Sequence, residues 1–314
     1  IDYLINEKTK SILDGNPHIN AFHFWGHFSI GIVLGRSGGK TLWQTVRDNV
    51  KLASATLRSL RAEQYDVIIN ARAYPPSNNW FLTLCRPRHL ISYDISMASY
   101  FADYWAHYDL DDAEAANLWA LIEPLVGQRA ESSVEFHNFA DQDETKRKML
   151  DLSGPDLEQD SYAVISPVTF DEERCLSQDT WAEIIRFLVN ERDMKVVLTA
   201  LPLHADYCTE IWGKVGYDKN VFLATQFNLP ELATIMKRAQ LVLTIDSFPA
   251  FLAVASGTPT IDFFNKDLWY TKGLSDVKTF IEARSITPVG KSLKAVYPLD
   301  VTPQEVIEKI NAIM

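Results

Sequence analysis

The sequence predicts an α/β protein of two domains, in which parallel strands alternate with helices. Its 314 residues are enough for about two domains of ordinary size. Short apolar and β-branched runs such as 195–200 (KVVLTA) and 241–245 (LVLTI) are typical of strands that are buried on both faces. Segments with helical spacing separate these runs, and this alternation builds a parallel sheet covered by helices.

In the first half of the chain, strands are expected at 1–5, 21–25, 30–34 and 65–70. The last of these reads YDVIIN and is the strongest strand signal. Residues 42–62 repeat apolar side chains at helical spacing, which predicts a long helix. Residues 98–126, rich in Trp and Tyr, are also expected to be helical.

A linker is expected near residues 150–160. The apolar periodicity fades between 127 and 159, the stretch 141–148 is entirely polar, and Ser153-Gly154-Pro155 interrupts regular structure. The predicted domains are therefore residues 1–155 and residues 156–314.

The second half alternates more regularly, with strands expected at 163–167, 195–200, 241–245 and 260–264. A helix is expected at 180–189, because its apolar residues are spaced i, i+3, i+4, i+7. Capping boxes at Asn228 and Thr302, each with Glu three residues later, predict two further helix starts. A short helix is expected at 249–256.

Composition and charge exclude several classes of protein. No apolar run approaches the roughly 20 residues of a membrane helix, and no signal peptide opens the chain. The three cysteines have neither disulfide-framework nor zinc-site spacing, which indicates a reducing, cytoplasmic setting. A net charge of −11 argues against general nucleic-acid binding. Residues 1–92 nevertheless carry 11 basic and 6 acidic side chains, and this part of the chain could lie near an anionic surface.

Two strand ends are candidate ligand sites. Asp246 and Ser247 follow one predicted strand and Pro249 begins a helix, so free amides at this helix start suit a diphosphate. Ser166, Thr169 and Arg174 follow another strand and offer hydroxyls and a guanidinium. The alternatives are an ordinary strand–turn–helix junction with a serine cap, and a surface loop with a solvated arginine.

Three other patterns carry less weight. Residues 35–41 (GRSGGKT) resemble a P-loop, but Leu34 stands where the first glycine is required. No GxGxxG follows a strand, which argues against a dinucleotide oxidoreductase. His23 and His27 are four apart on a predicted strand, where that spacing does not converge on a metal ion.

Together these segments resemble glycosyltransferase family 9, the ADP-heptose:lipopolysaccharide heptosyltransferases. Residues 228–264 are similar to the family's hallmark, in which a helix and a strand lead to D-[ST]-G-P-x-H-L-A-x-A-x-G-x-P. Residues 162–181 resemble its loop with a basic residue before a tryptophan. Residues 65–72 resemble its Y-D-x-x-[IV]-D strand, and 16–19 its N-P-x-[IV] turn.

The resemblance implies a GT-B fold, with two Rossmann-like domains facing a central cleft. It also implies inverting sugar transfer from a nucleotide-diphospho-sugar, without a metal ion or other cofactor. Lipopolysaccharide core is the implied acceptor, at the inner face of the inner membrane. The implied donor-binding residues are Ser166, Thr169, Arg174, Leu201, Asp246, Ser247, Phe248, Pro249 and Ala250. Leu201 would lie at the nucleobase, the amides of Phe248 and Ala250 would hold phosphate, and Arg72 and His107 would face the acceptor.

The chain departs from the family pattern at four places. Phe248 replaces the glycine after D-[ST], Phe251 replaces the histidine, and His204 stands at the usual acidic position, with Asp206 as an alternative ribose contact. The family's first strand, whose loop carries its catalytic aspartate, is expected upstream of residue 1; the alternative is that the protein has abandoned this base. Three alternatives follow: a different nucleotide-sugar donor, a sugar-nucleotide 2-epimerase, for which no paired carboxylates are found, and a catalytically silent sugar-nucleotide-binding protein.

Overall fold

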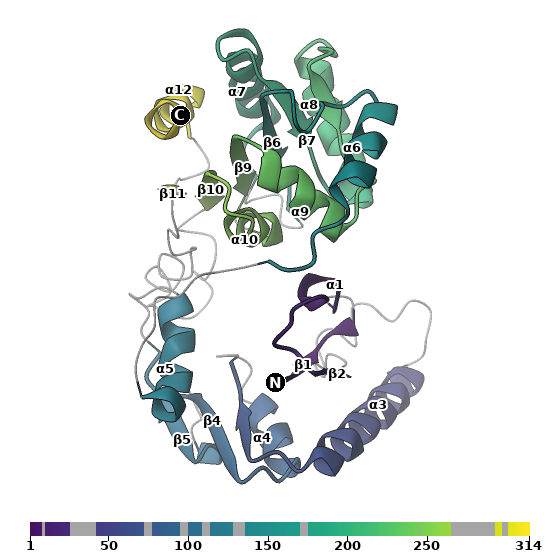
Figure 1. Cartoon of the computed structure of the whole chain (residues 1–314), viewed down its shortest axis with the longest axis vertical. Helices are drawn as coiled ribbons and strands as arrows, with labels where there is room; N and C mark the ends of the chain where they lie inside the picture. The colour runs from purple at the N-terminus through teal and green to yellow at the C-terminus, as the bar shows by residue number, and fades with distance from the viewer. Residues whose placement is uncertain are drawn as a thin grey trace. The chain divides into compact units, whose positions relative to one another are not determined.

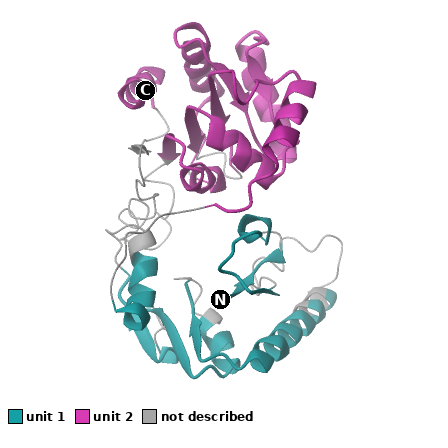
Figure 2. Cartoon of the chain, viewed as in Figure 1, with its two compact units in different colours: residues 1–109, 116–130 teal, residues 110–115, 131–314 magenta. Residues whose placement is uncertain are grey.

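The computed structural model describes residues 1–7, 10–25, 42–71, 77–94, 100–108, 114–127, 136–169, 175–245, 247–264, 293–296 and 301–314. The strand expected at 30–34 and the P-loop-like segment lie outside these residues. The chain forms two compact units (Figure 2). Unit 1 comprises Ile1–Asp109 and Ala116–Ala130, and unit 2 comprises Leu110–Ala115 and Glu131–Met314.

Unit 2 contains a six-stranded parallel sheet with the strand order β11-β10-β9-β6-β7-β8 (Figure 1). The first and fourth of these strands along the chain are neighbours at its centre, as in doubly wound nucleotide-binding folds. The strands are β6 (Tyr162–Ser166), β7 (Lys195–Leu198), β8 (Val221–Leu223), β9 (Leu241–Ile245), β10 (Thr260–Phe264) and β11 (Leu293–Val296).

Helices cover both faces of the sheet in unit 2 (Figure 1). One layer contains α7 (Gln178–Asn190), α8 (Ala205–Lys214) and α12 (Pro303–Ile313). The other contains α9 (Leu229–Arg238) and α10 (Phe248–Ala255), with α6 (Gln142–Asp151) packed against α9. The predicted capping boxes at Asn228 and Thr302 are both confirmed, at the starts of α9 and α12.

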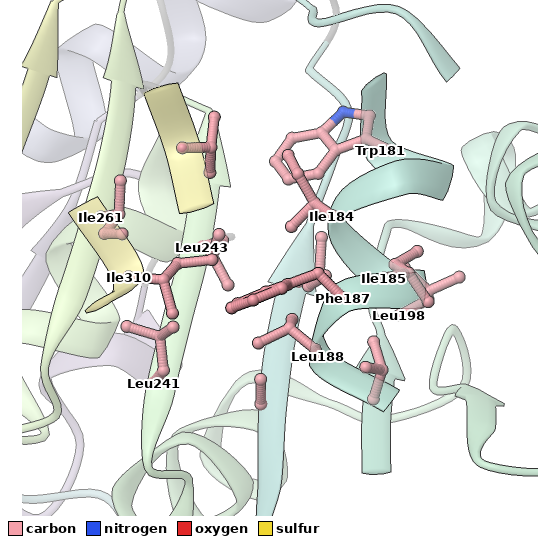
Figure 3. Packing of buried hydrophobic residues seen from close by; sticks show 14 of the residues in the cluster. Trp181, Ile184, Ile185, Phe187, Leu188, Leu198, Leu241, Leu243, Ile261 and Ile310 are labelled. Carbon is pink, nitrogen blue, oxygen red and sulfur yellow. The ribbon is translucent and has the colours of Figure 1, made fainter. Parts of the chain in front are cut away.

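The core of unit 2 is formed where α7 packs on the sheet (Figure 3). The four α7 residues predicted from their spacing, Trp181, Ile184, Ile185 and Leu188, are all completely buried. Trp181, Ile184 and Leu188 point toward side chains from β9 and β10 and toward Ile310 of α12. The helical periodicity therefore identified the buried face of this helix.

Unit 1 contains two parallel sheets, β1-β2 and β3-β4-β5. Its strands are β1 (Asp2–Ile5), β2 (Ala21–Phe24), β3 (Val67–Ile69), β4 (His89–Tyr93) and β5 (Tyr104–Ala106). Its helices are α1 (Lys10–Leu13), α3 (Leu42–Glu63), α4 (Ser77–Leu84) and α5 (Glu114–Val126). An apolar cluster that includes Leu60, Phe81 and Leu90 joins α3, α4 and β4, with Leu4 of β1 packed against it.

One expectation about secondary structure was wrong. The expected helix at 98–126 contains strand β5, and the helix itself begins only at Glu114. The aromatic residues Tyr104 and Trp105 pair with Ile91 and Ser92 of β4, so strand pairing overrides the local pattern. The polar stretch at 141–148 is helix α6, which buries only Thr145 and Met149 and therefore shows little apolar periodicity.

The boundary between the compact units lies near residue 130, whereas the sequence places the domain boundary at 155. Side chains of α9 hold the intervening segment on unit 2. Thr234 Oγ1 donates to the carbonyl of Ala140 (3.1 Å), and Lys148 Nζ lies 2.9 Å from both carboxylate oxygens of Glu231. These contacts join residues far apart in the sequence, so no local pattern reports them.

Candidate donor site and comparison with known proteins

The candidate donor residues follow three neighbouring strands at one edge of the unit 2 sheet. Ser166 ends β6, Leu201 follows β7, and Ser247 follows β9. Because these strands are parallel neighbours, their carboxyl ends meet at the same edge. The chain reverses direction across the sheet between β6 and β9, and ligands of doubly wound sheets bind at this switch point.

The start of α10, which follows β9, has no side-chain hydrogen bond that caps it. Ser247 occupies the N-cap position of α10 with extended backbone (φ −163°, ψ −178°). Its hydroxyl donates to the carbonyl of Ile245 (2.8 Å) and caps no helix amide, unlike the serine cap of the alternative interpretation. A helix start without a side-chain cap leaves amide donors for other partners, anions above all.

The two amides predicted to bind phosphate, those of Phe248 and Ala250, differ in how deeply their residues are buried. Ala250 is completely buried and its N–H donates to the carbonyl of Ser247 (3.1 Å), so this amide is already used by the helix turn. Phe248 is the first residue of α10 and is only partly buried. Pro249 follows it in the first turn, where its lack of an N–H costs nothing. The Phe248 amide is therefore the better candidate, while Asp246 lies outside the described residues.

The side chain of Phe251, which replaces the family histidine, is 46% exposed and so is not part of the core. It lies one turn after Phe248 on α10. An exposed ring here offers an apolar surface where the family pattern has an imidazole.

The loop after β6 is closed at its base by a hydrogen bond from a backbone N–H to a cysteine sulfur. Ser166 is 2% exposed and pairs in register with Thr244 of β9. Thr169 is partly buried, and its N–H donates to Cys175 Sγ (3.5 Å), which brings the two ends of the loop together. Arg174 falls within this loop but lies outside the described residues. The sequence patterns did not indicate a role for Cys175.

Leu201 is 49% exposed and immediately precedes the 3-10 turn Pro202–His204. An exposed leucine beside this edge of the sheet is consistent with contact to a flat apolar group. Asp206, the alternative ribose contact, lies in the first turn of α8 and is exposed.

In unit 1, His107 follows β5 and Asp94 follows β4, so both stand at the carboxyl edge of that sheet. His107 Nδ1 lies 2.6 Å from Asp94 Oδ2, and Asp94 Oδ1 accepts the backbone N–H of Tyr108 (3.0 Å). The His107 side chain is 77% exposed. Asp94 was missed because β4 was not expected, although His89–Tyr93 carries enough apolar residues to suggest a strand. Arg72 lies outside the described residues.

A buried polar chain supports the same edge of unit 1. Asn70 Nδ2 donates to Asn79 Oδ1 (2.6 Å), and Asn79 Nδ2 donates to Ser92 Oγ (2.8 Å). All three residues are buried, so these hydrogen bonds satisfy groups that would be costly to leave unpaired. They fasten the ends of β3 and β4 to the first turn of α4.

Two negative findings concern only the parts of the chain that the structure describes. Within them, no group of three or more His, Cys, Asp or Glu side chains could hold a metal ion. In those same ranges, no helix is both long and apolar enough to cross a bilayer.

Solved structures share this fold. A glycosyl transferase family 9 protein from Veillonella parvula DSM 2008 aligns with a TM-score of 0.75 and 13% identity, covering 100% of this chain and 87% of that one. Escherichia coli heptosyltransferase WaaC with ADP-2-deoxy-2-fluoro heptose aligns with a TM-score of 0.69 and 14% identity, covering 99% and 89%. The chain is thus an α/β protein of the GT-B class, which confirms the predicted fold class.

Sequence comparison identifies the family. A model described as glycosyltransferase family 9 (heptosyltransferase) matches residues 54–293. Lipopolysaccharide heptosyltransferase 3 of Escherichia coli (strain K12) is 27% identical over 276 residues, which cover 84% of this chain and 73% of that protein. The chain belongs to glycosyltransferase family 9 and is a glycosyltransferase, as its resemblance to that family predicted.

Proposed function

We propose that this chain transfers a heptose from ADP-heptose to the inner core of lipopolysaccharide, with inversion at the anomeric carbon and without a metal ion. The donor and acceptor classes come from its relatives, which are named as lipopolysaccharide heptosyltransferases, one of them with an ADP-heptose analogue. We further propose that it works at the cytoplasmic face of the inner membrane, with unit 2 binding the donor and unit 1 the acceptor.

The observation that carries this proposal is the uncapped start of α10 beside the switch point between β6 and β9. In the proposed reaction an acceptor hydroxyl attacks the anomeric carbon and passes its proton to a general base. The bond from that carbon to the diphosphate oxygen breaks, and ADP leaves with the bonding electrons. The Phe248 amide and the positive end of α10 stabilise the charge that develops on the diphosphate. Leu201 contacts the nucleobase, and Ser166 and Thr169 line the loop beside the phosphates. Arg174 supplies a further cation.

Substitution at Phe248 tests this assignment directly. Phe248→Pro removes the amide hydrogen at a helix position that tolerates proline, and the extended backbone of Ser247 suits a residue before proline. Phe248→Ala removes the same ring but keeps the amide. We expect Phe248→Pro to weaken ADP binding by about 1.5–3 kcal/mol, the range for a hydrogen bond to a charged group, and Phe248→Ala to change it much less. Isothermal titration calorimetry with ADP measures both.

Equal affinities for ADP in the two variants would remove the Phe248 amide from the donor site. The same titrations with GDP- and UDP-sugars test the donor class, because a tighter complex with either would replace ADP-heptose in the proposal. Inversion is checked by the anomeric configuration of the product in NMR spectra, and metal independence by unchanged transfer in the presence of a chelator.

A catalytically silent sugar-nucleotide-binding protein is the second candidate, favoured by Phe251 at the position of the family histidine. The two candidates differ in turnover. Release of ADP from ADP-heptose only when a lipopolysaccharide acceptor is added supports the enzyme. Tight ADP-heptose binding without release, with every core acceptor tried, supports the silent protein.

A further inference from the structure

Unit 1 carries a group of exposed aromatic side chains that the proposed reaction does not use. Trp80 is 56% exposed, Trp105 60%, Tyr100 83% and Phe101 40%. Of the tryptophans whose side chains the structure describes, Trp80 and Trp105 are the two that are more than half exposed. Large exposed aromatic groups cost solvation free energy and mark interaction surfaces when they are contiguous.

Hydrogen bonds and strand register place these side chains together beside α4. Ser92 faces α4, since its hydroxyl accepts from Asn79, and Trp105 is the register partner of Ser92 on the neighbouring strand β5. Paired residues of parallel strands project from the same face, so Trp105 projects on the side of α4. Trp105 is therefore on the face of the sheet against which α4 packs.

The segment before β5 meets the same helix. Thr83 Oγ1 lies 3.5 Å from the carbonyl oxygen of Phe101, and Thr83 stands three residues after Trp80, on the same side of α4. The opposite side of α4 is buried, because Phe81, Leu82 and Cys85 pack in the core of unit 1. The exposed side chains on α4, on β5 and on the segment before β5 that meets α4 are called here the aromatic patch: Trp80, Tyr100, Phe101 and Trp105.

The charges around the aromatic patch favour an anionic partner. Helix α4 contains no charged residue. Arg86 lies two residues after the end of this helix, is exposed, and forms no ion pair with any residue that the structure describes. Its backbone N–H donates to the carbonyl of Thr83 (3.0 Å). Asp103, two residues before Trp105, directs its carboxylate to the backbone N–H of Leu90 (2.7 Å).

We propose that the aromatic patch and Arg86 dock this protein on the surface of an anionic lipid bilayer. Tryptophan and tyrosine place an apolar ring and a polar tip at the level of lipid headgroups, and an arginine beside them attracts anionic lipids. This inference rests on the proposed function in one respect: a lipopolysaccharide acceptor is anchored in a membrane, so the protein must reach it from the water side. Docking by a surface patch meets that need without a spanning helix.

Vesicle co-sedimentation of the full chain, without donor or acceptor, tests the proposal separately from the reaction. We expect binding to vesicles of phosphatidylcholine and phosphatidylglycerol. The double variant Trp80→Ser/Trp105→Ser should weaken it at least about tenfold, equivalent to about 1.4 kcal/mol. Tyr217→Ser, which removes an aromatic side chain 62% exposed on unit 2, should leave binding unchanged. Arg86→Gln should weaken binding to anionic vesicles about fivefold and not to pure phosphatidylcholine.

Three results would overturn the proposal. The first is equal binding of the wild type and the double variant, or no binding by the wild type, with unchanged melting temperatures showing that both are folded. The second is loss of self-association in the double variant by sedimentation velocity, which would make the patch an interface between two copies. The third concerns the KM of the double variant relative to the wild type. If this KM rises equally for a delipidated, water-soluble core acceptor and for the same acceptor in vesicles, the patch binds the sugar of the acceptor.

Discussion

Cys175 differs from the other two cysteines of the chain in its surroundings. Burial raises the pKa of the Cys85 thiol to about 11 and that of Cys208 to about 12, so both are protonated and inaccessible near neutral pH. Cys175 is partly exposed and stands at the base of the loop after β6, where its sulfur accepts the N–H of Thr169. The rate at which this thiol is alkylated therefore tests whether a ligand binds at the proposed donor site.

We expect iodoacetamide near pH 8 to alkylate Cys175 first and to leave Cys85 and Cys208 unmodified, because the thiolate is the reactive form. Saturating ADP should slow the reaction of Cys175, because a diphosphate over the loop after β6 restricts access to its sulfur. Peptide mass spectrometry of timed samples measures each site. Alkylation in denaturant is the control in which all three cysteines react. An unchanged rate with ADP would count against phosphate binding at this loop.

Among the helices, α9 shows how local signals and tertiary contacts combine. Asn228 Oδ1 accepts the N–H of Glu231 (3.0 Å), and Glu231 Oε2 accepts the N–H of Asn228 (2.7 Å). The same Glu231 carboxylate binds Lys148 of α6, whose ammonium also lies 4.5 Å from the centre of the Phe227 ring. The capping box therefore begins the helix and also holds α6 on unit 2.

Asn228→Ala should lower the free energy of unfolding of unit 2 by about 1 kcal/mol, because the side-chain acceptor at the N-cap is lost. Asn228→Asp keeps an acceptor oxygen and should stay within a few tenths of a kcal/mol of the wild type. Urea unfolding followed by circular dichroism compares the three proteins. If Asn228→Ala and Asn228→Asp unfold at the same urea concentration, the cap contributes nothing measurable.

Gly154 lies between α6 and β6, where the chain packs closely against β8. A Cβ atom at Gly154 would lie 3.0 Å from the carbonyl oxygen of Met149 and 3.2 Å from Cδ1 of Phe222 in β8. We expect Gly154→Ala to destabilise unit 2 by about 1–3 kcal/mol, the usual cost of overpacking. Gly213→Ala is the matched control, since its Cβ would meet only the end of the Tyr217 side chain at 3.2 Å. Differential scanning calorimetry tests both, and a neutral Gly154→Ala would show that the segment docks loosely.

At the scale of the whole molecule, ion pairs join α6 to the segment that links it to β6. Lys146 Nζ lies 2.6 Å from Glu158 Oε2 and 3.2 Å from Asp156 Oδ1. The hydrogen bond from Lys146 lowers the pKa of Glu158, and the backbone N–H of Glu158 is the main cause of the lowered pKa of Asp156. The hydrogen bonds to Glu158 and Asp156 raise the pKa of Lys146.

The pH dependence of stability follows from these directions. The carboxyl pKa values are lower in the folded than in the unfolded chain, so their stabilisation is complete above the unfolded values near pH 4 and is lost as the pH falls through the folded values. The Lys146 contribution is lost only at high pH, as the pH rises through its raised folded pKa. We expect the melting temperature to fall from about pH 5 to pH 3, and less steeply in Lys146→Met. Lys219→Met, at an exposed lysine, is the control; a Lys146→Met curve parallel to the wild type would contradict this account.

Sequence patterns predicted much of unit 2 and less of unit 1. Strands β6, β7, β9 and β10 and helices α7, α9 and α12 were expected near their observed bounds, because each carries strong periodicity or a capping box. Strand β5 was missed because its aromatic residues depend on pairing with β4. The Ala250 amide, predicted to hold phosphate, donates to the Ser247 carbonyl, a contact that depends on how α10 begins.

Periodicity, capping residues and the hallmark run at 228–264 were sufficient to predict the α/β class, the family and the strand ends that carry the donor candidates, since these signals act over a few neighbouring residues. Three-dimensional packing decided the strand order that brings β6, β7 and β9 together, the assignment of α6 to unit 2, and the pairing of His107 with Asp94. The physical reason is that these features depend on contacts between residues distant along the chain. Their free energy comes from burial and hydrogen bonding that exist only once the chain has folded.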